Sequence, residues 1–196
     1  SSAVLKGAKI RFADVDIDSG NITSNSIEPL INSKTKAITV VHLGGWPADI
    51  KNIAALAKSY DLDLIEDCSQ AHGAKFDNKY VGTFSDISTW SFCNDKIIST
   101  GGEGGMISSS NPEYFQKIWS YRDHGKDRNL VENKASNSSY QWLHTNLGSN
   151  IRMTELQSAI GRIQLTKLEN WIKKRTNNAQ ILISYLSDIN SIRVPL

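Results

Sequence analysis

Two adjacent carboxylates mark the first segment that could do chemistry. Glu66 and Asp67 stand at the end of an apolar run and are followed by small and polar residues. Side chains of a strand alternate between the two faces of a sheet, so one of the two carboxylates should point toward a crevice beyond the strand end. The alternative is an acidic turn that caps a helix, and the pattern alone leaves both interpretations open.

A lysine marks the second segment. Lys96 follows another strand-like run, and a turn with Gly102 and Gly104 comes soon after it. Burial lowers the pKa of a lysine and frees its amine for Schiff-base chemistry. Taken alone, such a lysine is more often a surface residue of a loop. The glycines match no nucleotide-binding fingerprint, because the third glycine of GxGxxG and the GxxxxGK spacing do not occur.

The third segment precedes a helix that is predicted to begin at Thr154. Asn150 and Arg152 stand just before it, and the N-terminus of a helix favours anions such as phosphate. An ordinary cap is the other interpretation, with Thr154 as the N-cap and Gln157 closing a capping box. Both interpretations can hold together.

These segments are expected to lie on an alternation of strands and helices. Strands are predicted over residues 8–13, 36–42, 63–66, 88–92 and 106–110, and helices over residues 26–31, 48–60, 112–122 and from 154 to about 186. The polar stretch 126–146 is predicted to be a loop. The alternation favours an α/β fold with a mostly parallel sheet flanked by helices.

Composition excludes several classes of protein. The 196 residues carry a net charge of +2 and are 39% hydrophobic, and no apolar run is long enough to span a membrane. The basic run 173–175 is interpreted as a solvated helix face rather than a nucleic-acid patch. Cys68 and Cys93 lack metal-ligand spacing and, without a disulfide framework, indicate a reducing cytoplasm. We therefore predict a cytoplasmic protein without a metal site and without nucleic-acid or membrane partners.

Taken in order along the chain, the motifs resemble the pyridoxal-phosphate (PLP) sugar aminotransferases of the DegT/DnrJ/StrS family. The matching stretches are residues 12–16, 41–49, 65–74, 81–86, 91–96, 102–105, 122–125 and 148–157. The resemblance implies the large domain of the aspartate aminotransferase fold, type I. Because family members are longer, it also implies that residues 1–165 are part of the PLP-binding large domain without its N-terminal portion. Residues 166–196 would be the connecting helix and the start of the small C-terminal domain.

The resemblance assigns roles to single residues around the cofactor ring. Lys96 would form the internal aldimine with PLP and then move a proton between the substrate and the cofactor. Asp67 would pair with the pyridine nitrogen, which makes the ring an electron sink. Gln70 would lie near the 3-hydroxyl of the ring, and Ser69 would lie against the ring.

The resemblance also implies a phosphate site, an assembly and a reaction. Ser91 would bind the cofactor phosphate together with Asn150 of a neighbouring subunit, so a homodimer with shared active sites is expected. The reaction would transfer an amino group from L-glutamate, or glutamine, to a nucleotide-linked keto-deoxysugar. Two alternatives stay open. One is a catalytically inactive fragment or homologue that keeps only the fold and the dimer surface. The other is a PLP-dependent sugar dehydratase, in which histidine would replace Lys96.

Overall fold

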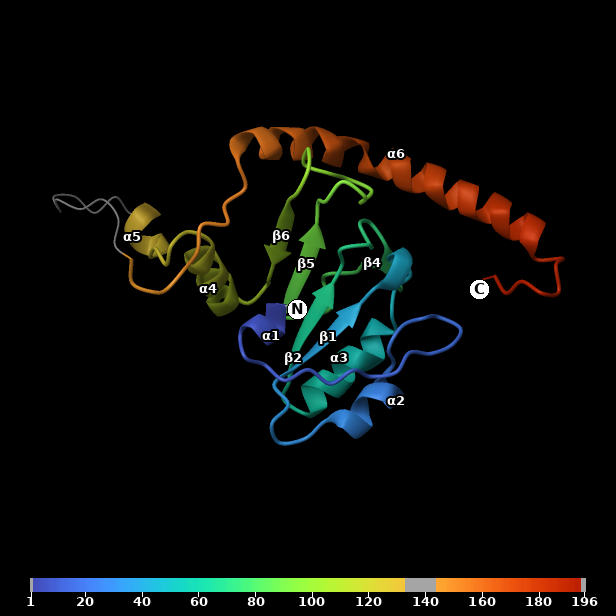
Figure 1. Ribbon diagram of the computed structural model, residues 1–196, viewed down its shortest axis with the longest axis horizontal. Coiled ribbons are helices and arrows are strands. Elements are labelled where there is room, and N and C mark those ends of the chain that lie inside the picture. The colour runs from blue at the N-terminus through green and yellow to red at the C-terminus, as the bar shows by residue number, and fades with distance from the viewer. Residues whose placement is uncertain (1, 133–143, 195–196) are drawn as a thin grey trace.

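A four-stranded sheet organises the fold in the computed structural model, which describes residues 2–132 and 144–194 (Figure 1). The strand order is β1 (Ala37–Val41), β2 (Asp63–Asp67), β5 (Ile87–Ser91) and β6 (Gly105–Ser108). The first three strands are parallel, and β6 runs antiparallel to β5. The predicted α/β fold with a mostly parallel sheet is confirmed.

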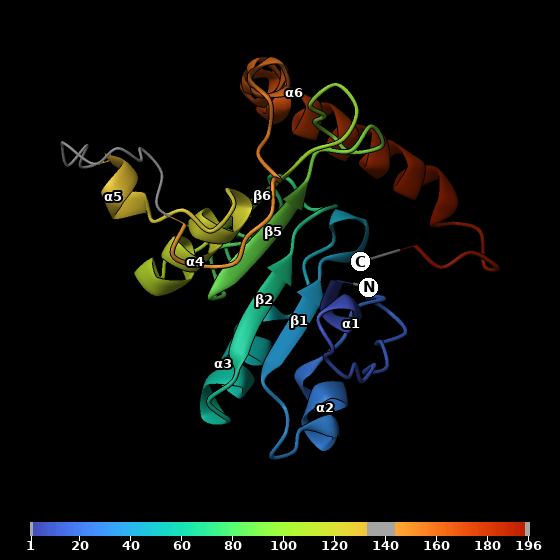
Figure 2. The same cartoon turned by 60° about the vertical axis from the view of Figure 1, so that its left-hand side comes forward.

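The hydrophobic core lies between this sheet and helix α3 (Ile50–Ser59), which covers one face (Figure 2). Burial alternates along β1, where Ile38 and Val40 point inward. They contact a cluster that includes Ile50 and Ile53 of the helix. The helix begins two residues later than predicted, because the Asp49 side chain accepts a hydrogen bond from the N–H of Asn52 and caps it.

The other elements surround this core. They are α1 (Ser2–Leu5), α2 (Ser24–Ile27), the 3₁₀ helices Glu28–Leu30 and Leu43–Gly45, β3 (Lys75–Phe76), β4 (Lys79–Tyr80), α4 (Pro112–Arg122), α5 (Arg128–Glu132) and α6 (Glu155–Leu186). The strands β3 and β4 form a two-stranded hairpin that the sequence pattern did not reveal. Among the described residues, no helix combines the length and apolar composition needed to cross a membrane.

Helix α6 runs past the ends of β1, β2 and β5 (Figure 1). Its start confirms the predicted cap, since Thr154 and Gln157 form a capping box. The helix continues without interruption across the predicted domain boundary between residues 165 and 166.

Two predictions of secondary structure are corrected. Residues 8–13 form no strand, because no described segment runs beside them to complete a hydrogen-bonded ladder. A β-like pattern is not enough for a strand without a neighbour. The predicted loop 126–146 contains the short helix α5, and its residues 133–143 lie outside the described part of the chain.

Candidate active site

The register of the parallel strands separates Glu66 from Asp67. In β1, β2 and β5, Val41, Asp67 and Thr89 are paired, and so are Val40, Glu66 and Ser88. Paired residues of neighbouring strands point to the same face. We call the face of Val40, Glu66 and Ser88 the buried face, since all three are at most 1% exposed, and the face of Asp67 the open face. As strand alternation predicts, the two carboxylates point to opposite faces.

Glu66 is saturated with hydrogen bonds on the buried face. Its carboxylate oxygens accept from the Nε2 of His42 at 3.1 Å, the N–H groups of Gly82 and Phe84 at 2.6 and 3.0 Å, and the hydroxyl of Ser85 at 2.6 Å. Burial alone would raise the pKa of Glu66, but these donors outweigh it and hold the pKa below its usual value. The carboxylate thus joins β1, β2 and the turn before β5.

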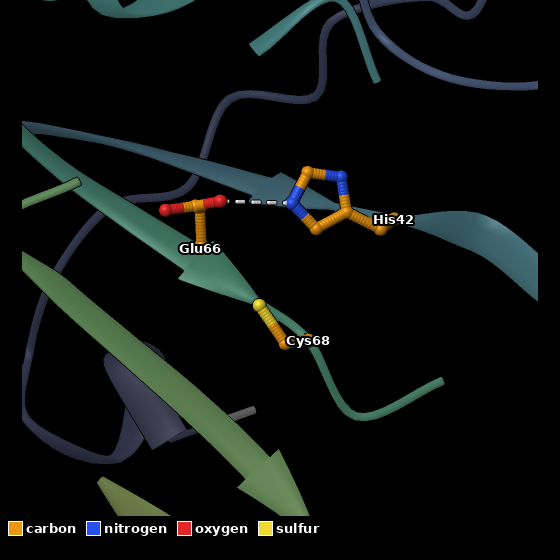
Figure 3. A group of neighbouring side chains, drawn as sticks. All are labelled: His42, Glu66 and Cys68. Carbon is orange, nitrogen blue, oxygen red and sulfur yellow. Dashed lines mark hydrogen bonds and ion pairs between the residues drawn. The ribbon is translucent and has the colours of Figure 1, made fainter. Parts of the chain in front are cut away.

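The side chains next to Glu66 also make their contacts within the protein. His42 accepts the N–H of Ala48 at its Nδ1, at 3.0 Å, so its Nε2 carries the proton donated to Glu66. Cys68 lies beside this pair, and burial together with the nearby carboxylates raises the pKa of its thiol (Figure 3). A metal would need a free nitrogen of His42 and a thiolate at Cys68. This geometry instead assigns the three side chains a structural role.

Among the described residues, Asp67 has fewer hydrogen-bond partners on the open face than Glu66 has on the buried face. One carboxylate oxygen accepts the backbone N–H of Ser69 at 3.0 Å. Gln70, three residues later, is exposed, and its amide oxygen accepts the N–H of Gly44 at 2.6 Å. The turn after β2 therefore holds Asp67, Ser69 and Gln70 together, next to the turn after β1.

Lys96 lies in the loop after β5, and its side chain is 17% exposed. Its Nζ is 3.0 Å from a carboxylate oxygen of Asp95. That hydrogen bond raises the pKa of Lys96, whereas burial acts in the opposite direction, and the charge of Asp67 also raises it. The lowered pKa that burial alone gives a lysine does not arise here, because the adjacent carboxylate outweighs desolvation. Ser91 ends β5, and its hydroxyl accepts the N–H of Cys93 at 3.3 Å.

The third predicted segment does not join this group within the subunit. The backbone of Asn150 pairs with Asp123, and its side chain is exposed. Among the described residues, Asn150 forms no hydrogen bond with the groups around Lys96. Arg152 is bound by a short ion pair to Asp123, so its charge serves this segment rather than an anion at the start of α6. The predicted anion-binding role of Arg152 is thus not supported.

Sequence reasoning missed two groups near Lys96. His72 is 7% exposed and lies against the rings of Trp90 and Phe92, with centroids 5.5 and 5.8 Å away. Burial lowers the pKa of His72, and the charge of Lys96 lowers it further. The second group is on α6, where residues of the basic run line a pocket shared with Lys96. The position of His72 within the Asp67 segment was a usable signal, whereas the pocket required the tertiary fold.

The open-face groups suit PLP. Asp67 retains acceptor capacity for a protonated pyridine nitrogen, Ser91 offers a hydroxyl to a phosphate, and Lys96 offers an amine to an aldehyde. The parallel strands bring the ends of β2 and β5 to one edge of the sheet, where α/β folds bind ligands. The fold is that of the type I PLP-dependent transferases.

The comparisons with known proteins identify the family. Residues 1–195 match the model of the DegT/DnrJ/EryC1/StrS aminotransferase family, and the chain belongs to this family. The chain is 40% identical over 186 residues to the GDP-perosamine synthase of Escherichia coli O157:H7, an alignment that covers 95% of this chain and 47% of that protein. The predicted family, a family of PLP-dependent sugar aminotransferases, is confirmed.

Solved structures agree with this assignment. An aminotransferase from Psychrobacter cryohalolentis superposes with a TM-score of 0.96 at 45% identity, over 100% of this chain and 50% of that chain. An E. coli GDP-4-keto-6-deoxy-D-mannose-3-dehydratase with bound hydrated PLP gives a TM-score of 0.82 at 32% identity, over 95% of this chain and 50% of that chain. The chain therefore spans about half the length of the relatives it matches.

Proposed function

We propose that this chain is part of an aminotransferase that uses PLP to move an amino group from L-glutamate to a nucleotide-linked keto-deoxysugar. The observation that carries the proposal is the meeting of Asp67, Ser91 and Lys96 at the edge where β2 and β5 end. Lys96 stands where, by resemblance, the sugar dehydratases have histidine. It therefore favours transamination over dehydration, although a dehydratase is among the similar structures.

Each residue has a distinct task in this proposal. Lys96 holds the cofactor through its Nζ and moves a proton at the same atom. Asp67 keeps the pyridine nitrogen protonated, Gln70 contacts the 3-hydroxyl, and Ser69 supports the ring. PLP, when bound, supplies an electron sink that makes the amino group transferable. The pair with Asp95 keeps the free amine of Lys96 protonated, so binding of an aldehyde requires loss of that proton.

The assembly is part of the same proposal. Ser91 binds the cofactor phosphate together with Asn150 of a second subunit. Two observations are consistent with this: the side chain of Asn150 is exposed, and its backbone pairs with Asp123 rather than with the groups around Lys96. Residues 1–165 belong to the large domain, and residues 166–196 lead to a smaller domain. A cytoplasmic location stays a prediction.

The first experiment is an absorbance spectrum of the purified full chain with added PLP, before and after borohydride. We expect a reducible band that is lost in Lys96→Ala. The matched control is Lys173→Ala, which removes an exposed lysine that pairs with Glu169 on α6. Retention of the band in Lys96→Ala would contradict the proposal, and its absence from the unaltered chain would favour the inactive-fragment alternative.

The second measurement separates the two reactions. The protein is incubated with L-glutamate and GDP-4-keto-6-deoxy-D-mannose, and the products are followed by mass spectrometry. Formation of 2-oxoglutarate and an amino sugar supports transamination. Formation of a deoxygenated keto sugar without incorporation of nitrogen would favour the dehydratase alternative, and recovery of unchanged sugar would favour the inactive homologue.

A further inference from the structure

A pocket separates helix α6 from the loop that carries Lys96. Its volume is about 440 Å³, which lies within the range of small-molecule sites. One wall contains Lys96 and Ser99, and the other contains Gln164, Trp171, Lys174 and Arg175 of the helix. The pocket thus opens directly beside the proposed reacting amine, at the sheet edge over which α6 passes (Figure 1).

Contacts on both sides of the pocket fix the position of α6. On one side, the Nε2 of Gln157 donates to the carbonyl of Glu103 at 2.7 Å. On the other side, Ile172 approaches Gly73 so closely that a Cβ on this glycine would collide with the Cδ1 of the isoleucine. These two contacts hold α6 in place, so the pocket is an open groove beside an anchored helix.

The pocket has a positive charge that the protein does not neutralise. Within the described part of the chain, Lys174 and Arg175 form no ion pair or hydrogen bond, and no carboxylate is among the lining residues. The adjacent Lys173, in contrast, is paired with Glu169 at 2.9 Å. Two uncompensated cations facing one concavity raise the local concentration of anions.

We propose that Lys174 and Arg175 form a subsite for a phosphate-bearing ligand, with Trp171 as its apolar wall. Arginine and lysine together suit phosphate oxygens, and an indole suits the flat or apolar part of the same molecule. Phosphate could come from the cofactor or from the nucleotide of the substrate. The proposal assigns the subsite to the diphosphate of the nucleotide-linked substrate, and in this respect it rests on the proposed function.

The test is a calorimetric titration with inorganic pyrophosphate, which carries the diphosphate without a base, a sugar or an aldehyde. The double variant Lys174→Ala/Arg175→Ala should bind pyrophosphate at least about tenfold more weakly than the unaltered chain, a change of about 1.4 kcal/mol. Lys173→Ala is the matched control, because it removes a neighbouring charge that is already paired. Since both substituted residues are exposed, the double variant should unfold at the same urea concentration as the unaltered chain.

Further measurements distinguish the cofactor phosphate site from the proposed diphosphate subsite. The double variant should keep the affinity for PLP and the reducible absorbance band. Loss of pyrophosphate binding in Ser91→Ala, with binding retained in the double variant, would place the anion at the cofactor phosphate site and overturn the proposal. Equal weakening by Lys173→Ala, or no binding to the unaltered chain, would also overturn it. Because pyrophosphate binding needs no covalent cofactor, the subsite is tested independently of the role of Lys96.

Discussion

The two faces of the central sheet use polar residues in opposite ways. On the buried face, Glu66 accepts four hydrogen bonds from the protein, and both ring nitrogens of His42 are engaged. On the open face, Asp67 accepts one backbone N–H, and the hydroxyl of Ser91 accepts another. Polar groups whose hydrogen bonds are all made within the protein stabilise the fold, whereas groups that can still accept or donate hydrogen bonds are available to a ligand. Two carboxylates adjacent in sequence thus have different tasks.

The largest test of this comparison exchanges each carboxylate for its amide. Glu66→Gln places an NH₂ group among donors and should lower the free energy of unfolding by about 3 kcal/mol. Asp67→Asn should lower it by less than about 0.5 kcal/mol, because the amide oxygen can still accept the N–H of Ser69. Urea unfolding at neutral pH measures both free energies.

The same two substitutions should affect PLP binding in the opposite order, with the larger effect in Asp67→Asn. Asp67→Asn should lose the stabilisation of a protonated pyridine nitrogen, so its PLP absorbance spectrum should change although its fold is intact. Comparable losses of stability in the two variants would show that the faces do not differ, and the comparison would fail.

Acid unfolding gives a second, smaller test of the buried face. The hydrogen bonds to Glu66 hold its pKa below the value of an unfolded glutamate. The resulting stabilisation is fully present above the unfolded-state pKa, about 4.3, and is lost as the pH falls through the lower folded-state pKa. The unfolding free energy of the unaltered chain should therefore fall below about pH 4.3, and that of Glu66→Gln should fall less steeply. Equal slopes in a urea series from neutral to acid pH would contradict this.

The sequence predicted elements well where local chemistry determines them. The helix over residues 112–122 was found at its observed bounds, because Pro112 marks its start. The start of α6 followed from Thr154 and Gln157 for the same reason. The strand expected over residues 8–13 failed because a strand depends on a neighbour, which no local pattern provides.

The site was predictable only in part, for a related reason. Asp67 and Lys96 stood out because each follows a strand and matches a family motif. The bonds of Glu66 join residues 42, 66 and 82–85, and such long-range contacts leave no spacing signal. The basic run on α6 was interpreted as a solvated face. Lys173 fits that description, but the pocket between Lys96 and Lys174 arises only when the helix is placed over the sheet edge.

A third test concerns the helix that borders the open edge. Gly73 has φ = +79°, and a Cβ there would meet Ile172 of α6. Gly44 has φ = +61° but open space at the same position, so it is the matched control. Gly44→Ala should cost about 1 kcal/mol of backbone strain, and Gly73→Ala about 2 kcal/mol, because the second also forces the side chain of Ile172 aside. Thermal or urea unfolding measures the difference.

Gly73→Ala should also change ligand binding at the open edge of the sheet. Displacement of Ile172 should widen the pocket and weaken pyrophosphate binding, whereas Gly44→Ala should leave that binding unchanged. Equal unfolding free energies in the two variants would mean that the contact with Ile172 does not anchor α6.

The smallest test compares two serines of β5 that lie on opposite faces. Ser88 is 1% exposed, and its hydroxyl bonds to the carbonyl of Gly82 at 2.9 Å and the hydroxyl of Ser108 at 2.6 Å. Ser88→Ala should therefore cost about 1 kcal/mol of stability and leave the affinity for PLP unchanged. Ser91→Ala should cost less than about 0.5 kcal/mol, because within the described residues its half-buried hydroxyl accepts the N–H of Cys93 alone, but it should weaken PLP binding. Urea unfolding and PLP titration of the same two samples give four numbers. If the same serine variant shows both the larger loss of stability and the larger loss of PLP affinity, the difference between the two faces does not extend to β5.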